Sequence, residues 1–152
     1  MANYGIDILN EARLLADAGV FNHALRRYRA FFKEFEKGKY KDIEGSEDIY
    51  FEAFAEYATL RAEIGDVDRK LKEELEKVIG KAMDNENTSI SIYSILYLAY
   101  VKVLEALGED IDPKKLRRLF SKIIPLVVIE VRGGEGRRVR HPTLSPELMG
   151  LY

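Results

Sequence analysis

The stretch from Ala12 to Phe35 constrains the fold more than any other part of the sequence. Its apolar residues recur at steps of three and four, the spacing that places side chains on one face of a helix. Gly19 interrupts this pattern, and glycine is the residue that most readily ends a helix in a left-handed turn. Only Val20 to Asn22 separate the two periodic segments. Two helices joined by so short a turn must run antiparallel and touch, so we predict a helical hairpin.

The residue types within this hairpin form a motif. A small residue, a glycine, an aromatic two positions later, an alanine and a second aromatic occur in order at Ala12, Gly19, Phe21, Ala24 and Tyr28. This order resembles the tetratricopeptide repeat, a helix–turn–helix unit of about 34 residues. The resemblance covers about 25 residues of the chain and implies a stack of helical hairpins.

The hairpin also departs from the pattern of that family. Ile8 stands where the family often has tryptophan, and Glu11 stands where it usually has leucine. Phe31 and Glu36 replace a usual alanine and a usual proline. A generic helical hairpin in a closed bundle therefore stays open as the alternative.

A second copy of the motif is degenerate. Ala58 and Gly65 repeat the spacing of the first small residue and glycine, but Val67 replaces the first aromatic, and the charged residues Lys70 and Glu74 replace the alanine and the second aromatic. The turn glycines Gly19, Gly65 and Gly108 are 46 and 43 residues apart, which is longer than the repeat of the family. We therefore expect three irregular hairpins rather than a regular array.

Four further helices are predicted downstream of the first hairpin. The third helix comes after a charged loop at residues 37–46, with Ser46 as its predicted N-cap and Gly65 as its end. Asp66 is then the predicted cap of the fourth helix, whose apolar residues recur at helical spacing as far as Ala82.

The last two predicted helices differ in character. Residues 90–107 form the most apolar segment, so we expect this helix to be buried on several sides. Asp112 with Pro113 directly after it is typical of a helix start, and Pro125 is the predicted end of the sixth helix. The expected fold class is all-α, with about six helices in three antiparallel hairpins, either TPR-like or an irregular bundle.

The sequence changes after Pro125. Leu126 to Val131 is nearly continuous in β-branched and apolar residues and predicts a strand, with a glycine-rich turn and a returning strand at residues 137–141 behind it. A two-stranded hairpin alone is marginal in water. We therefore predict a helical-hairpin domain at residues 1–125, and a small C-terminal β-hairpin and tail at residues 126–152 that pack on that domain or on a partner chain.

Composition limits the class of protein. The 152 residues are 47% hydrophobic, which fits one domain with a sizeable core. The chain has no cysteine, which excludes disulfides, thiol nucleophiles and thiolate metal sites. We see no signal-peptide pattern and no apolar run of about 20 residues, so we expect a cytoplasmic protein without a membrane segment. Abundant Lys and Glu without Gln or Trp favour a thermophilic source.

Charge is distributed unevenly along the chain. The net charge is only −2, but residues 1–112 carry 15 basic and 23 acidic residues, whereas residues 113–152 carry nine basic and three acidic residues. Residues 1–112 therefore carry a net charge of −8, and residues 113–152 carry a net charge of +6. Such asymmetry makes the basic end a candidate contact for an acidic partner.

No pattern typical of a catalytic, cofactor-binding or metal-binding site occurs. His23 and His141 are the only histidines, and neither has a second histidine or a carboxylate at metal-ligand spacing. The GGEG run comes after a predicted strand without opening a helix, unlike a dinucleotide-binding turn. Glu52 and Glu56, one helical turn apart, are interpreted as part of a solvated face. We therefore expect no cofactor and no enzymatic activity.

Two groups of residues are candidates for binding. The first is the basic C-terminal segment and the apolar tail behind it, because arginine forks suit phosphates and carboxylates; a solvated, charge-protected strand edge is the alternative. Its members are Arg132, Arg137, Arg138, Arg140, His141, Leu144, Leu148 and Tyr152. The second is a row of tyrosines on the fifth helix, Tyr93, Tyr97 and Tyr100, which predict either core packing, the favoured interpretation, or a ligand groove.

The function that these observations favour is protein–protein interaction or scaffolding, because a stack of helical hairpins offers a concave face to another protein or peptide. The rival is a small accessory subunit that contacts nucleic acid through the basic C-terminal segment. The same segment also predicts a homo-oligomer, because a strand edge and an apolar tail invite pairing with a second copy.

Overall fold

A computed structural model describes residues 6–121 of the protein. Within this range the chain forms six α-helices and no β-strand, which confirms the all-helical prediction for the part of the chain that is described. The helices are α1 (Asp7–Asp17), α2 (Phe21–Glu36), α3 (Ser46–Glu63), α4 (Arg69–Asp84), α5 (Ile90–Leu107) and α6 (Pro113–Leu119). The predicted β-hairpin and tail at residues 126–152 lie outside the described residues.

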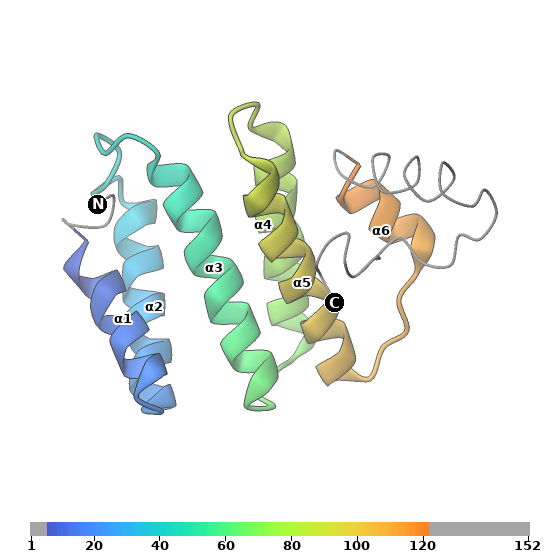
Figure 1. The fold of residues 1–152 in the computed structure, drawn as a ribbon, viewed down its shortest axis with the longest axis horizontal. Helices are drawn as coiled ribbons and strands as arrows, with labels where there is room; N and C mark the ends of the chain where they lie inside the picture. The colour runs from blue at the N-terminus through green and yellow to red at the C-terminus, as the bar shows by residue number, and fades with distance from the viewer. Residues whose placement is uncertain (1–5, 122–152) are drawn as a thin grey trace.

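The helices alternate between two layers. α1, α3 and α5 lie in front, and α2 and α4 lie behind them (Figure 1). α1 packs on α2, α3 contacts α2, α4 and α5, and α6 packs on α4. One cluster of buried apolar side chains runs through all six helices, from Ile6 to Phe120. The described helices therefore share a single core.

Glycines end four of the described helices, three of them at the positions that the sequence predicts. Gly19 has a φ of +80°, and its N–H donates to Ala16 while the N–H of Val20 donates to Leu15. These two bonds form a Schellman motif, which satisfies carbonyl groups that the end of a helix leaves free. The same pair of bonds ends α2, α3 and α5, where the left-handed residues are Gly38, Gly65 and Gly108.

Helix starts agree less closely with the sequence prediction. The predicted cap of α4, Asp66, lies two residues before the observed cap, Asp68. The N–H of Asp66 donates to a carbonyl group at the end of α3. The carboxylate of Asp68 accepts the N–H of Leu71. Ser46 is the first residue of α3 rather than its cap. Asp112 and Pro113 do begin α6, with Asp112 accepting from the N–H of Lys114. The predicted end of this helix at Pro125 is wrong, because the backbone leaves the helical conformation at Phe120 and α6 ends at Leu119.

Aromatic side chains fill the contact between α2 and α3. The ring of Phe32 lies 5.0 Å from that of Phe54 and 5.2 Å from that of Tyr57, measured between centroids. Phe35 stacks on Tyr50 at 4.6 Å. Ring pairs at such distances add to the burial energy of their area, so this contact fixes how the first two helices meet the rest of the molecule.

α5 is the central helix of the second half. By length and composition alone it is apolar enough to cross a membrane, with a mean hydropathy of 1.5 over 18 residues. In the structure it packs against α3 and α4, and 44% of those residues are buried. A core helix passes the same test of composition. The buried residues of α5 lie on one broad face, while Ile90 and Leu98 are exposed, so its burial is less complete than the sequence predicts.

Candidate functional site

Side chains from four helices line a hollow that we call the front groove. It has a volume of about 640 Å³ and crosses α1, α3 and α5, with two side chains from α2. Its lining consists of Arg13, Ala16, Asp17, Phe21, Tyr28, Glu52, Ala55, Glu56, Thr59, Leu60, Glu63, Ile95, Leu98 and Lys102. The groove therefore depends on helices that are distant in sequence and adjacent in space.

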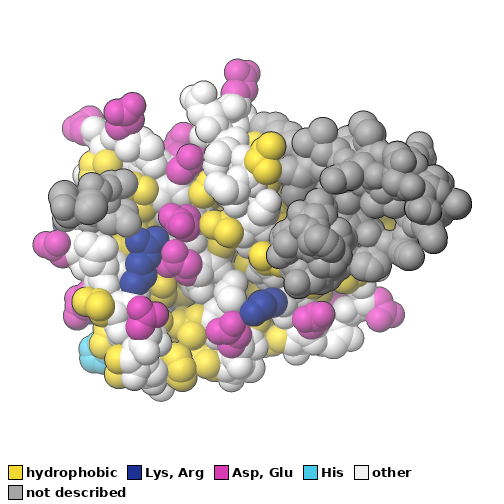
Figure 2. Space-filling view, viewed as in Figure 1, with side chains coloured by type: hydrophobic (Ala, Val, Ile, Leu, Met, Phe, Trp, Pro, Cys, Tyr) yellow, Lys and Arg dark blue, Asp and Glu magenta, His cyan; other side chains and the backbone are white. Residues whose placement is uncertain are grey.

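Apolar side chains form much of this lining. Leu98 of α5 and Phe21 of α2 leave 36% and 39% of their surface exposed, and the side chain of Ile95 is half-buried. Figure 2 shows apolar surface between acidic side chains on this face of the molecule. Apolar surface rimmed by charges is typical of sites that bind a partner.

Three residues join α1, α2 and α3 in the lining of the front groove. Arg13 donates from Nε and Nη2 to the two carboxylate oxygens of Glu56, at 2.9 and 3.0 Å. The hydroxyl of Tyr28 donates to the same carboxylate at 2.9 Å. Bidentate, charge-assisted bonds of this kind are strong and fix geometry. They hold the walls of the groove in register.

Acidic side chains outnumber basic ones in the lining of the front groove. Burial raises the pKa of Glu52, and the neighbouring charge of Glu56 raises it further. Burial also raises the pKa of Tyr28, as do the charge and the hydrogen bond of Glu56. In both cases a nearby negative charge disfavours a second one. A cationic group would therefore be attracted here.

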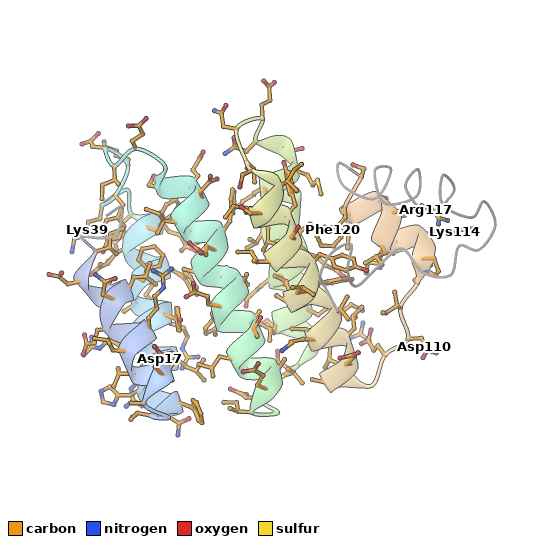
Figure 3. The ribbon with its side chains drawn as sticks, viewed as in Figure 1. Asp17, Lys39, Asp110, Lys114, Arg117 and Phe120 are labelled. Carbon is orange, nitrogen blue, oxygen red and sulfur yellow. The ribbon has the colours of Figure 1, made fainter. Side chains whose placement is uncertain are left out.

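The cations of the front groove are already engaged. Lys102 forms an ion pair with Glu63 at 3.1 Å, and Arg13 is bound to Glu56. Four carboxylates and two cations line the groove, so two negative charges are in excess. Glu52 lies 3.8 Å from Arg13, and the last carboxylate, Asp17, is exposed near the end of α1 (Figure 3).

Glu56 has a role that sequence reasoning missed. Its spacing from Glu52 predicts a solvated face, yet Glu56 is half-buried and holds two partners from other helices. A signal was present in the neighbours of Glu56, because Phe54, Ala55, Tyr57 and Ala58 are all apolar and all buried. A carboxylate flanked by core residues on both sides must find partners within the fold.

The tyrosines predicted as a possible ligand groove lie in the core. Tyr93, Tyr97 and Tyr100 are each at most 4% exposed. Tyr93 donates to the carbonyl oxygen of Ala82, Tyr100 donates to Glu76 at 2.7 Å, and the ring of Tyr97 meets that of Phe120. None of the three lines the front groove. The three tyrosines therefore pack in the core, as the favoured interpretation of their spacing predicts.

The remaining candidate residues lie away from the front groove or beyond the described range. The predicted partner contacts, from Arg132 to Tyr152, lie outside the described residues, as does His141. His23 is exposed on α2, where its Nδ1 lies 3.1 Å from Nη2 of Arg26. Among residues 6–121 no group of three or more metal-ligating side chains converges.

A second hollow, of about 630 Å³, lies where α2, α3 and α4 meet. Two of its three aromatic members, Tyr50 and Phe51, are buried at 7% and 4% exposure, and the third, Phe35, is half-buried. It therefore presents less apolar surface to a partner than the front groove does.

No protein-family model matches the chain, and neither the curated proteins nor the solved structures include one with significant similarity to it.

Proposed function

We propose that the protein is a TPR-like stack of three helical hairpins whose front groove binds a segment of another protein chain. The layered order of the helices supports this proposal. α3 contacts its sequence neighbours α2 and α4 and also α5, the next helix of its own layer, while α4 contacts α6. Contacts between successive and alternate helices are what a stack of hairpins produces.

The motif residues agree with this arrangement. Ala12 and Ala24, at the small positions of the motif, have no exposed surface where α1 meets α2, and Tyr28 is 3% exposed. Small residues let two helices approach closely. The first hairpin is therefore built around the positions that carry the resemblance.

The observation that carries the functional proposal is the composition of the front groove. It combines exposed apolar side chains, such as Leu98, with fixed charges, such as the Arg13–Glu56 pair. Apolar surface supplies affinity, and oriented charges supply register and specificity. This combination favours recognition of a peptide segment over reaction with a small substrate.

A photo-crosslinking amino acid placed at Leu98 of the full chain tests the proposal in an extract of the native host. We expect mass spectrometry to find a defined protein segment joined to position 98. The matched control is Ile90, which lies on the same helix, is 60% exposed and does not line the groove. A binding role for the groove would be contradicted if positions 98 and 90 gave the same crosslinked proteins. It would also be contradicted if position 98 gave no crosslinked protein.

A second candidate is contact with nucleic acid through the basic end. The described part of that end supports it, because Lys114, Arg117 and Arg118 of α6 are exposed, and Figure 3 shows the first two on this helix. Retention of DNA or RNA that weakens steeply with salt would favour this function. Replacement of Arg137, Arg138 and Arg140 by Ala should then abolish retention while helical content is unchanged. No retention at low salt excludes it.

A further inference from the structure

The front groove and the C-terminal end of the same sequence are complementary in charge. Residues 132–141 hold four arginines and one glutamate. In the groove, four carboxylates face two cations, and both cations are already paired with carboxylates. Asp17 and Glu52 supply the excess negative charge. An occupant that neutralises them must therefore be basic.

We propose that the front groove binds the arginine-rich segment, residues 132–141, of a second copy of this chain. This inference rests on the proposed function, since it names the segment that the groove takes. Arginine is suited to such a site because its planar fork can bind a carboxylate through two hydrogen bonds. The arginines of the segment would bind Asp17 and Glu52.

The apolar lining of the groove fits the residues that follow the segment. Leu144 and Leu148 come after the arginines in sequence, and Leu98 and Phe21 offer exposed apolar surface in the groove. Charged contacts would then set the register, and apolar contacts would supply most of the affinity.

The course of the chain allows the segment to reach a second copy. α6 packs on α4, a helix that does not line the front groove. Beyond Ser121 the sequence continues for 31 residues, which span up to about 100 Å when extended. This length is ample to reach a neighbouring molecule. Reciprocal exchange of two segments between two grooves would close a symmetric dimer.

Light scattering on the full-length protein at low salt tests the proposal. We expect a dimer at high micromolar concentration. Reversing charge in the groove with Asp17→Lys and Glu52→Lys should weaken dimerisation at least about tenfold, and so should reversing charge in the segment with Arg137→Glu and Arg138→Glu. Combining the groove and segment reversals should restore the dimer, because the attraction is then re-established with opposite signs.

The choice of residues makes the test specific. Asp17 and Glu52 can be changed while the bonds of Glu56 to Arg13 and Tyr28 stay in place. If the lysine variant does not fold, Asp17→Asn with Glu52→Gln gives the same readout with a smaller change. The matched control is Glu86→Lys with Asp110→Lys, two exposed acids outside the groove. These substitutions change the net charge equally and should leave the dimer intact.

Several results would overturn the inference. These are a full-length monomer at high micromolar concentration, a dimer that resists both reversals, a dimer broken equally by the control, and a combined variant that stays monomeric. The proposed function fails separately. A monomer that crosslinks from position 98 to a different protein in the host extract would keep the binding role of the groove and refute the second copy as its occupant. Crosslinking to no protein would remove both.

Discussion

Glu56 is the residue whose loss should matter most around the front groove. It alone accepts hydrogen bonds from both Arg13 and Tyr28. Glu56→Gln keeps the shape of the side chain but removes its charge and one of the two acceptor oxygens, so one N–H of Arg13 faces an amide donor instead. We expect a loss of about 1–3 kcal/mol in the free energy of unfolding, measured by urea denaturation.

The matched control for this change is Glu52→Gln, one turn away on α3. Glu52 approaches Arg13 only to 3.8 Å, and its pKa is raised by burial and by Glu56, so its ionised form is disfavoured in the fold. Removing its charge should change stability little or raise it slightly at neutral pH. An equal loss of unfolding free energy for Glu56→Gln and Glu52→Gln would show that the hydrogen bonds of Glu56 do not account for the effect.

Gly19 offers a second test at the scale of single residues. Its φ of +80° is strained for any residue with a Cβ, and most of all for a β-branched one. A Cβ at this position would meet nothing within 4 Å, so the cost of Gly19→Val comes from the backbone alone. We expect a loss of about 1–3 kcal/mol in thermal or chemical unfolding.

Gly80, inside α4 and four residues before its end, is the control for this argument. It has ordinary helical backbone and equally open surroundings, so Gly80→Ala should stabilise the protein by about 0.5–1 kcal/mol. A loss of stability for Gly19→Val and a gain for Gly80→Ala would confirm that backbone conformation, not packing, decides each effect. An unchanged melting temperature for Gly19→Val would contradict the role of the turn.

Individual helices show what local sequence can and cannot predict. The ends at Gly19, Gly65 and Gly108, and the start at Asp112, are predictable because each depends on a few neighbouring residues. The contact of α5 with α3 is not, because periodicity shows which face of a helix is buried but not which helix covers it. The front groove depends on that same long-range pairing, and it is therefore not visible in the sequence.

α6 is held by one carboxylate of α4. Glu76 accepts a hydrogen bond from Tyr100 of α5 and one from Lys115 of α6, each at 2.7 Å. Burial alone would raise the pKa of Glu76, but the bonds from Lys115 and Tyr100 outweigh it and lower the pKa. An acid with a lowered pKa stabilises the fold when it is ionised.

This linkage predicts a pH dependence for α6. The stabilisation by Glu76 should be fully present above its unfolded pKa of about 4.5 and should be lost as the pH falls below that value. The difference in unfolding free energy between the native protein and Glu76→Gln should therefore shrink on acidification. A difference that is constant from neutral pH to about pH 3 would exclude the ionised form as the source of the effect.

For the whole molecule, the single core predicts cooperative unfolding. Stacks of hairpins can lose their ends independently, but buried residues here form one cluster from Ile6 to Phe120. We expect hydrogen exchange near the unfolding midpoint to show α1–α2 and α4–α5 opening together, with one transition. Two separate transitions would indicate that the described helices unfold in two groups, divided between α2 and α3.

The buried tyrosines allow the fold to be followed by its own ultraviolet absorbance. The chain has nine tyrosines and no tryptophan, so tyrosinate formation is not masked by indole. Burial raises the pKa of Tyr50 to about 12, from 10 in the unfolded chain, and burial likewise raises the pKa of Tyr28 and of Tyr100. A phenol that resists ionisation in the fold stabilises it below pH 10 and loses that effect as the pH rises toward 12. Alkaline titration should therefore show a rise in absorbance that coincides with loss of helix, because ionisation of these phenols removes their contribution to stability.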